Sequence, residues 1–438
     1  MVKSKFLSYK VIRFCNSIVS RVFYGWWIVV LGSLIQAVGG GILYHSFTVF
    51  FLPLKRDLGV SMAAVSLLYG AARLEGGAEG PIVGHLIDRL GCRVMIIIGA
   101  SLAGIGLILL STVHSFWAFF LIYVFIVSLG FNAGFFHPVS AAVNNWFIRR
   151  RGVGFAIITS AGNIGGMVMA PLLSYIILNF GWRTGAVTAG LIILMVALPA
   201  ALPIHRSPET RGLYPDGRPP WRNQADVSRP ISQAAMEVDF SVREALRTFN
   251  YWLLSLSVTL RILVTVALST HLVPILVWKG MGEATSAYLV SLLAFSTIVT
   301  SLAMGWMGDR WNKVFLCSAG IVPTVVGMLG LMLSQATATL YAFPIAVATT
   351  MGTIPLNWAL IGDFFGRRSY ATLRGIMGVG NGIATFLSPI YAGWVFDRTG
   401  SYAIVLLTFS IILLIAAILF AVLRHPSPPK GKREIFPA

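Results

Sequence analysis

The sequence predicts an all-α polytopic membrane protein with twelve transmembrane helices, arranged as two six-helix bundles that are related by a parallel repeat. Three observations indicate this class. Of 438 residues, 57% are hydrophobic and only 11% are charged, and the mean hydropathy is +0.81, which is far from the average of soluble domains. Apolar windows of about 20 residues recur along the chain. Motifs of the first half also recur in the second half.

The apolar windows fall into two sets of six, separated by one polar stretch. The first set covers 24–50, 62–87, 94–113, 116–141, 153–178 and 185–203. The second set covers 251–277, 284–307, 314–334, 338–361, 371–396 and 402–423. We therefore divide the chain into a basic N-terminal segment (1–23), a first bundle (24–203), a cytoplasmic linker (204–250), a second bundle (251–423) and a tail (424–438).

A constant spacing relates the fifth and eleventh helices of this prediction. The pairs are Phe147 with Phe365, Arg149 with Arg367, Gly162 with Gly380, Asn163 with Asn381, and Pro171 with Pro389. Parallel repeats of this kind place ligand sites at the interface of the two halves, near the middle of the membrane. We therefore expect the site to lie between the bundles.

The linker is polar and too short to form a domain. Its last part, D-F-S-V-R-E-A-L-R-T-F, has Ser241 and Glu244 at the spacing of a capping box, which predicts a short amphipathic helix.

The positive charges predict the orientation in the membrane. Most of the 33 Lys and Arg residues fall on one side in alternate loops, and the other side holds Lys55, Arg56, Arg183, Lys279 and Arg398. By the positive-inside rule both termini are cytoplasmic, in a multi-pass protein of the plasma membrane. The net charge of +18 then predicts contact with anionic membrane lipid. Nucleic-acid binding is not favoured, because the positive charges are scattered over short loops.

The three cysteines, Cys15, Cys92 and Cys317, fall on or near the predicted cytoplasmic side, where thiols stay reduced. The cysteines and seven histidines show no metal-ligand spacing. We therefore expect no disulfide, no metal site and no cofactor, and no enzyme active site.

The second predicted helix carries three ionisable residues, Arg73, Glu75 and Glu79. Charges at this depth are costly and are tolerated where they face protein or water. Glu75 and Glu79 share one face, so their charges would repel if both were ionised, and one carboxyl is expected to hold a proton. The pair could carry protons across the membrane or belong to an ion-pair network that joins this helix to the eleventh. Arg73 lies near Gly76, Gly80 and Gly84, whose spacing lets another helix approach closely.

The same helix ends in Gly84, Asp88, Arg89, Gly91 and Arg93, which match the pattern G-x-x-x-D-R-x-G-x-R. A weaker copy follows at Gly305, Asp309 and Arg310. The pattern resembles the loop between helices 2 and 3 of the major facilitator superfamily. The resemblance implies alternating access, with Asp88, Arg89, Arg93, Asp309 and Arg310 as a cytoplasmic gate. Each aspartate would accept hydrogen bonds from the end of a facing helix in the outward-open state.

Within the superfamily, the chain resembles the monocarboxylate transporter and oxalate:formate antiporter group over nearly its whole length. The motifs are Y-G-W-W at 24–27, R-L-E-G-G-A-E-G-P at 73–81, N-W-F-I-R-R-R-G at 145–152 and G-W-R at 181–183. Members of that group commonly hold a carboxylate with a basic residue in helix 8 or 11. Here the eighth helix has no Lys or Arg, and the eleventh has Arg374 near its start.

Arg261 is the first candidate for binding an anion. It is about 15 Å into the seventh helix, with no other ionisable group for nine residues on either side. The alternative is a structural pair with a carboxylate of a neighbouring helix. Asn132 and His137 in the fourth helix, together with Arg73, are further substrate-binding candidates. His137 could instead be a buried histidine beside Pro138, and Arg73 a structural or gating partner.

The sequence therefore predicts a monomeric secondary transporter for a small organic anion such as a mono- or dicarboxylate, with a proton or a counter-anion as the coupled species. An efflux carrier for amphipathic compounds is the alternative within transport. It would need an apolar cavity. A transport-derived membrane sensor is the alternative from another class, but the linker is too short to supply an output domain. No ATP-binding G-x-x-x-x-G-K-S/T pattern is present in the sequence.

Overall fold

The computed structural model describes residues 23–59, 62–217, 239–334 and 336–427. Within these ranges the regular elements are helices, and none is a strand. Apart from Phe23, the basic N-terminal segment (1–23) lies outside the described residues, as do the middle of the linker and most of the tail (424–438).

The first half begins with α2 (Tyr24–Gly39), η1 (Gly40–His45) and α3 (Phe47–Leu58), which follow one another as the first helical path. We use helical path for the run of helical segments that corresponds to one predicted transmembrane helix. α4 (Met62–Leu90) and α5 (Cys92–Leu110) come next. The fourth path consists of α6 (Phe116–Ile122), η2 (Tyr123–Ser128), α7 (Leu129–Phe131), η3 (Asn132–Phe136) and α8 (His137–Trp146). α9 (Arg151–Ala201) consists of two helical paths. Gly181 has a φ of 84°, a left-handed value that breaks the helix there.

The linker contributes two short 3₁₀ turns, η4 (Pro208–Arg211) and η5 (Pro215–Gly217), and then α10 (Val242–Leu246). Ser241 and Glu244 form the predicted capping box at the start of α10. The second half consists of α11 (Phe249–Thr270), α12 (Leu272–Trp278), α13 (Glu283–Gly308), α14 (Lys313–Leu333), α15 (Thr337–Gly352), α16 (Ile354–Phe365), α17 (Tyr370–Thr399) and α18 (Ala403–Val422).

Nine helical segments of the described residues are long and apolar enough to cross a membrane. One of them is α9, which counts twice once it is divided at Gly181. α4 and α17 are not among the nine, yet with 29 and 30 residues each is long enough to span a bilayer. The described helices thus agree with six passes in each half.

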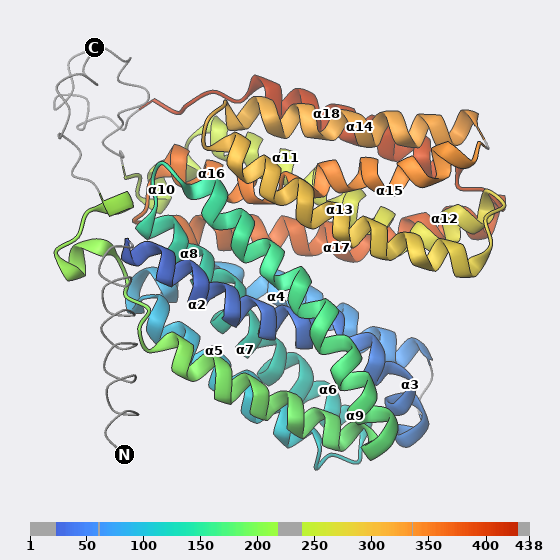
Figure 1. Ribbon diagram of the computed structural model, residues 1–438, viewed down its shortest axis with the longest axis horizontal. Coiled ribbons are helices and arrows are strands. Elements are labelled where there is room, and N and C mark those ends of the chain that lie inside the picture. Colours follow the sequence, from blue (N-terminus) through green and yellow to red (C-terminus); the bar gives the residue numbers. More distant parts are fainter. Residues whose placement is uncertain (1–22, 60–61, 218–238, 335, 428–438) are drawn as a thin grey trace, which may run out of the picture.

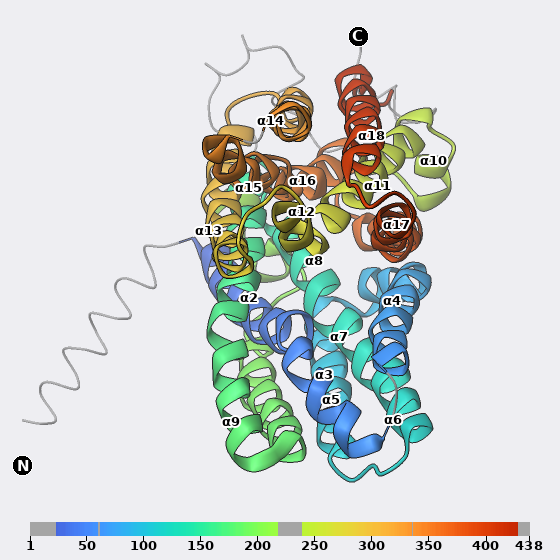
Figure 2. The same ribbon diagram turned by 90° about the vertical axis from the view of Figure 1, so that its right-hand side faces the viewer.

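The two halves pack side by side in Figures 1 and 2, with the first half coloured blue to green and the second yellow to red. The most extensive contacts between them are those of α4 with α17 and of α9 with α13. Glycines allow both close approaches. A Cβ on Gly80 would lie 2.5 Å from the carbonyl oxygen of Gly375, and one on Gly305 would lie 2.6 Å from that of Gly152. The small-residue spacing in α4 predicts this packing.

The described parts of the linker, the start of α2 and the end of α18 gather at the left of Figure 1. We call this end of the molecule the linker end and the opposite one the far end. The hydroxyl of Tyr24 donates to the carbonyl of Pro203 over 2.7 Å, which attaches the residue just before the linker to α2.

Candidate functional site

At the linker end, Asp88 of the first half caps the start of α17 in the second half. Its carboxylate accepts hydrogen bonds from the backbone N–H groups of Ala371 (3.3 Å) and Thr372 (2.9 Å) and from the Thr372 hydroxyl (2.6 Å). The first N–H groups of a helix have no partner within the helix and favour a nearby anion. Asp88 therefore joins the two halves in this conformation.

Asp309 makes the equivalent contact in the opposite direction. It follows α13 of the second half and accepts the N–H groups of Gly152 (2.7 Å) and Val153 (3.0 Å) at the start of α9. Burial raises the pKa of Asp309 to about 6, and the N–H of Val153 and the ammonium of Lys313 oppose that rise only in part. Each half thus caps one helix of the other.

A buried ion cluster lies beside Asp309. Arg151 of α9 is 1% exposed and contacts Asp363 of α16 at 3.0 Å, while Lys313 of α14 contacts the other Asp363 oxygen at 2.7 Å. Arg151 also donates to the carbonyl of Asn144 at 3.3 Å. This cluster is a second charged link between the halves. Sequence analysis missed it, because Arg151 was counted only as a loop charge and Asp363 was not singled out.

The other predicted gate residues lie at the same end but on the surface. Arg89, Arg93 and Arg310 are exposed. Arg310 lies over the ring of Trp306, 4.0 Å from its centroid, and donates to the carbonyl of that residue. Their gating role stays a prediction.

The two carboxyls of α4 lie together and face the fourth helical path. Glu75 accepts a hydrogen bond of 2.8 Å from the Ser128 hydroxyl. Glu79 is 9% exposed and has Glu75 and Asn132 as polar neighbours. Within the described part of the chain, neither oxygen of Glu79 has a hydrogen-bond partner of normal geometry. An ionised carboxylate without such partners is costly inside a membrane.

The partners of this pair sit at irregular points of their helix. Ser128 ends the π-helical segment η2, and Asn132 begins the π-helical segment η3. π-helical segments are uncommon in proteins, and those that occur often lie at functional sites. A Cβ on Gly76 would lie 2.5 Å from the Asn132 side-chain nitrogen, so the glycine leaves room for the amide beside Glu79.

Two buried arginine side chains, Arg261 and Arg374, contact residues of α16. Arg261 of α11 is 0% exposed, and Asn357 presents its amide oxygen to two of the Arg261 nitrogens at 3.1 Å each. Cys317 of α14 is another neighbour. No carboxylate of the described residues lies within 4 Å of Arg261, so the alternative pair with a carboxylate of a neighbouring helix is not present in this conformation.

Arg374 of α17 lies between two aromatic rings, one from each half. Its guanidinium carbon is 4.2 Å from the ring centroid of Phe136 and 4.3 Å from that of Trp358. It also donates to the Phe136 carbonyl over 3.1 Å. Arg374 is 2% exposed. Arg374 is thus a buried cation at the interface between the halves, which sequence analysis noted but did not select. Its nearness to the helix start gave no sign of the aromatic contacts.

His137 and Arg73 complete the predicted site residues. The ring of His137 lies 6.2 Å from that of Phe136, next to Arg374, and its Nδ1 has no hydrogen-bond partner in the described part of the structure. Arg73 is half-buried on α4, two residues before Glu75. The structure therefore gathers Glu75, Glu79 and Asn132 in one group and His137 with Arg374 in another. Arg261 lies deeper in the second half.

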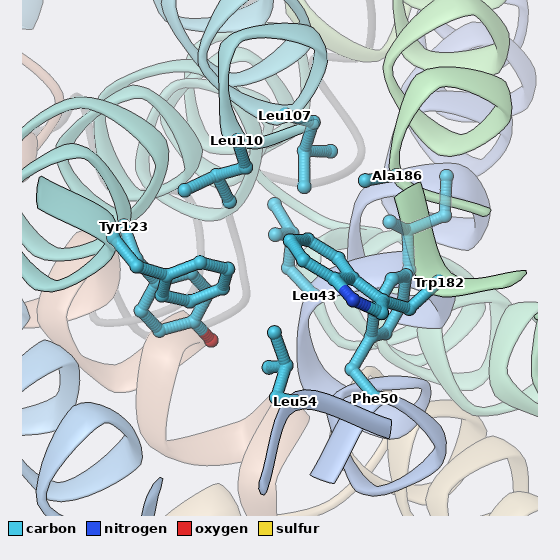
Figure 3. Close-up of a pocket in the computed structure, with 10 residues that line it drawn as sticks. Leu43, Phe50, Leu54, Leu107, Leu110, Tyr123, Trp182 and Ala186 are labelled. Carbon is cyan, nitrogen blue, oxygen red and sulfur yellow. The ribbon is translucent and has the colours of Figure 1, made fainter. Parts of the chain in front are cut away.

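Two cavities differ in character. The first is lined by apolar and aromatic side chains of the first half, eight of which are labelled in Figure 3. The second lies at the linker end and is polar. Its lining includes Asp88, Asn145, Arg206, Glu209 and Arg367, so it lies between the halves and the linker.

Comparison with known families agrees with this architecture. The model of the Major Facilitator Superfamily matches residues 29–353 and 247–437. The chain belongs to the major facilitator superfamily. Membership makes the protein a transporter and not an enzyme, and its several apolar helices make it a multi-pass membrane protein.

Curated relatives of this superfamily member include monocarboxylate transporters. Mouse monocarboxylate transporter 12 is 24% identical, with 94% of this chain and 88% of that protein aligned. Human monocarboxylate transporter 6 is 25% identical over 90% of this chain and 79% of its own length. These matches agree with the resemblance seen in the motifs.

Solved structures share the fold. The fucose:proton symporter of E. coli superposes with a TM-score of 0.69 at 15% identity, over 91% of this chain and 98% of that chain. A proton:xylose symporter gives a TM-score of 0.70 at 14% identity, over 92% and 96%. The human organic anion transporter MFSD10 gives 0.62 at 17% identity, over 90% and 98%.

Proposed function

We propose that this protein is a secondary active transporter that moves a small organic anion, a mono- or dicarboxylate, together with a proton. The observation that carries the proposal is the buried carboxyl pair of α4, in which Glu79 lies beside Glu75 and no cation of the described residues lies within hydrogen-bond distance of Glu79. Such a pair can take up a proton on one side of the membrane and release it on the other.

The cations that would bind the substrate anion lie in the second half. Arg261 and Arg374 supply them, because a guanidinium offers a planar fork that suits a carboxylate. Arg374 lies at the interface between the halves, and Arg261 lies behind it against α16. We propose that opening of the far end gives the substrate access to this region, with Asn132, His137 and Arg73 as further contacts.

The direction of opening follows from the gate contacts. Asp88 and Asp309 hold the linker end closed, so the protein in this conformation is closed toward the linker. The distribution of Lys and Arg supports a cytoplasmic linker and cytoplasmic termini in the plasma membrane. The far end would then open to the outside. The related monocarboxylate transporters and the organic anion transporter support the substrate class.

Uptake by purified protein in liposomes tests the proposal. Labelled monocarboxylates, dicarboxylates and a labelled amphipathic cation are offered with and without an inward proton gradient. We expect a carboxylate to accumulate, and faster with the gradient. Accumulation of the amphipathic cation alone would favour the efflux carrier. Carboxylate uptake that ignores the gradient, in vesicles shown to hold it, would instead point to exchange against a counter-anion.

A further inference from the structure

The turn that precedes α9 is held from two sides. Asp216 of the linker accepts the N–H groups of Ile148 (3.0 Å) and Arg149 (2.8 Å). The N–H groups at the start of α9 are accepted by Asp309 of the second half. Two carboxylates, one from the linker and one from the opposite half, therefore bind successive N–H pairs of one segment.

The turn that precedes α17 has the same arrangement. Asp239 of the linker accepts the N–H groups of Arg367 (2.7 Å) and Arg368 (3.1 Å). The N–H groups at the start of α17 are accepted by Asp88. The next linker residue, Phe240, donates its own N–H to the last residue of α16 at 3.1 Å. The two turns occupy equivalent places in the two halves, since one joins α8 to α9 and the other joins α16 to α17.

A third linker carboxylate crosses between the halves. Glu209 in η4 contacts Arg367 of the second half at 2.9 Å. The same Arg367 nitrogen donates to the carbonyl of Asn145 in the first half at 3.0 Å. The segment that carries Glu209 is fixed to the first half, because Arg211 lies 4.0 Å over the ring of Tyr24. Opening of the linker end must therefore break the Glu209–Arg367 contact.

We propose that the linker is a working part of the linker-end gate. Asp216 and Asp239 fix the two turns so that the next N–H groups point to Asp309 and Asp88, and Glu209 adds a contact that exists only in the closed state. The contacts of Asp216 and Asp239 each lie within one half and persist when the gate opens. The contacts of Asp88, Asp309 and Glu209 join different halves and break. This role goes beyond the proposed transport of an anion and does not depend on the substrate.

The first test measures opening without any substrate. Ala141 is 3% exposed and lines the polar cavity between the halves, so a cysteine there reacts with a thiol reagent only when the linker end opens. In purified Ala141→Cys protein in detergent, labelling of this position is followed by mass spectrometry. We expect Glu209→Gln to speed labelling by about 2- to 5-fold, as for one partly exposed ion pair. Asp216→Asn and Asp239→Asn should speed it by about tenfold, as for a lost helix-cap contact.

Glu244→Gln is the matched control, because it removes the same charge from the linker at the capping box of α10. It should leave the labelling rate unchanged. In a double-mutant cycle, Glu209→Gln combined with Arg367→Gln should raise the labelling rate by less than the product of the two separate increases. Each variant removes the same contact. Wild-type labelling in the three carboxylate variants, alongside faster labelling in Asp88→Asn, would overturn the proposal. So would equal acceleration by Glu244→Gln.

General loss of structure is separated by a second measurement. A variant that merely unfolds also loses its cooperative thermal transition, whereas a variant that opens the gate keeps it. An anion-transport assay that fails while these labelling differences hold would reject the proposed function and leave the role of the linker supported.

Discussion

The Ser128 hydroxyl donates a 2.8 Å hydrogen bond to Glu75, while Glu79, one turn further along α4, receives none of normal geometry in the described structure. The two carboxyls therefore have different environments, although they share a helix face. A pair of this kind places the proton on the carboxyl that lacks donors. We propose that Glu79 is the member of the pair that holds the proton.

We predict that Glu79→Gln abolishes the acceleration of uptake by an inward proton gradient, while substrate exchange without a gradient remains measurable. The amide imitates the protonated carboxyl but cannot release a proton. Uptake and counterflow in liposomes measure the two properties separately. Glu75→Gln is the control. Gradient dependence that survives in both variants would end the proton-carrier hypothesis.

Asp88→Asn is expected to weaken closure of the linker end more than it weakens substrate binding. It replaces one of the two oxygens that accept from Ala371 and Thr372 with an amide nitrogen that cannot accept, at a cost of about 1 to 3 kcal/mol. Spin labels on Leu90→Cys and Trp311→Cys, both at exposed positions of different halves, report the separation of the halves. A lost affinity with an unchanged distance distribution would contradict this prediction.

Acidification is expected to favour the closed linker end. Burial raises the pKa of Asp309 to about 6, so the closed state holds a proton more tightly than an open state in which Asp309 meets water. The charged form is disfavoured in the closed state, and this penalty is relieved as the pH falls through 6. The equilibrium constant for closing the linker end then rises by up to about tenfold for each pH unit. The same pair of spin labels measures it, and Asp309→Asn should remove the dependence. Opening on acidification would show that the sign is wrong.

Arg261→Lys is expected to weaken anion affinity by roughly 1.5 to 3 kcal/mol, because lysine keeps the charge and loses the fork. Isothermal titration with the transported carboxylate measures the change. Arg374→Lys is the comparison, since Arg374 lies nearer the interface. If Arg261→Ala folds and binds the anion as the wild type does, the binding cation is elsewhere. A loss confined to Arg374→Lys would then identify it.

Gly375→Ala is expected to keep α4 and α17 apart. A Cβ at this position would overlap the backbone of Gly80, whereas a Cβ on Gly378 meets nothing within 4 Å. Gly378→Ala on the same helix is therefore the control. We expect the first variant to lose transport and show a wider distance between the halves, and the second to match the wild type. Equal behaviour of the two would mean that the glycine contact does not limit closure.

The sequence predicted the helices and the repeat well, because hydropathy and spacing are properties of the chain itself. It did not predict which side chains of different helices contact one another. The isolation of Arg261 in an apolar run indicated burial, but its contact with Asn357 depends on how α11 packs against α16. The ion pair of Arg151 with Asp363 joins residues 212 positions apart in different halves. Local patterns carry no information on such a pair.

The irregular fourth path was also beyond the sequence. A continuous apolar run predicts a regular helix, and nothing in it indicated the π-helical segments that end at Ser128 and begin at Asn132. The first path likewise runs on to Leu58, past the predicted end at residue 50, although Pro53 lies within α3. In both places packing overrides the local preference of the chain.

The exchange of caps between the halves has a consequence for synthesis of the protein. Asp309 follows Gly152 by 157 residues, so α9 enters the membrane long before its capping carboxylate has been translated. Asp88 precedes Thr372 by 284 residues, so α17 meets its partner as soon as it emerges. The start of α9 must therefore rely on water and Asp216 until α13 is inserted. Ribosome-bound chains that end before α13 should show rapid amide hydrogen exchange there, and complete chains slow exchange.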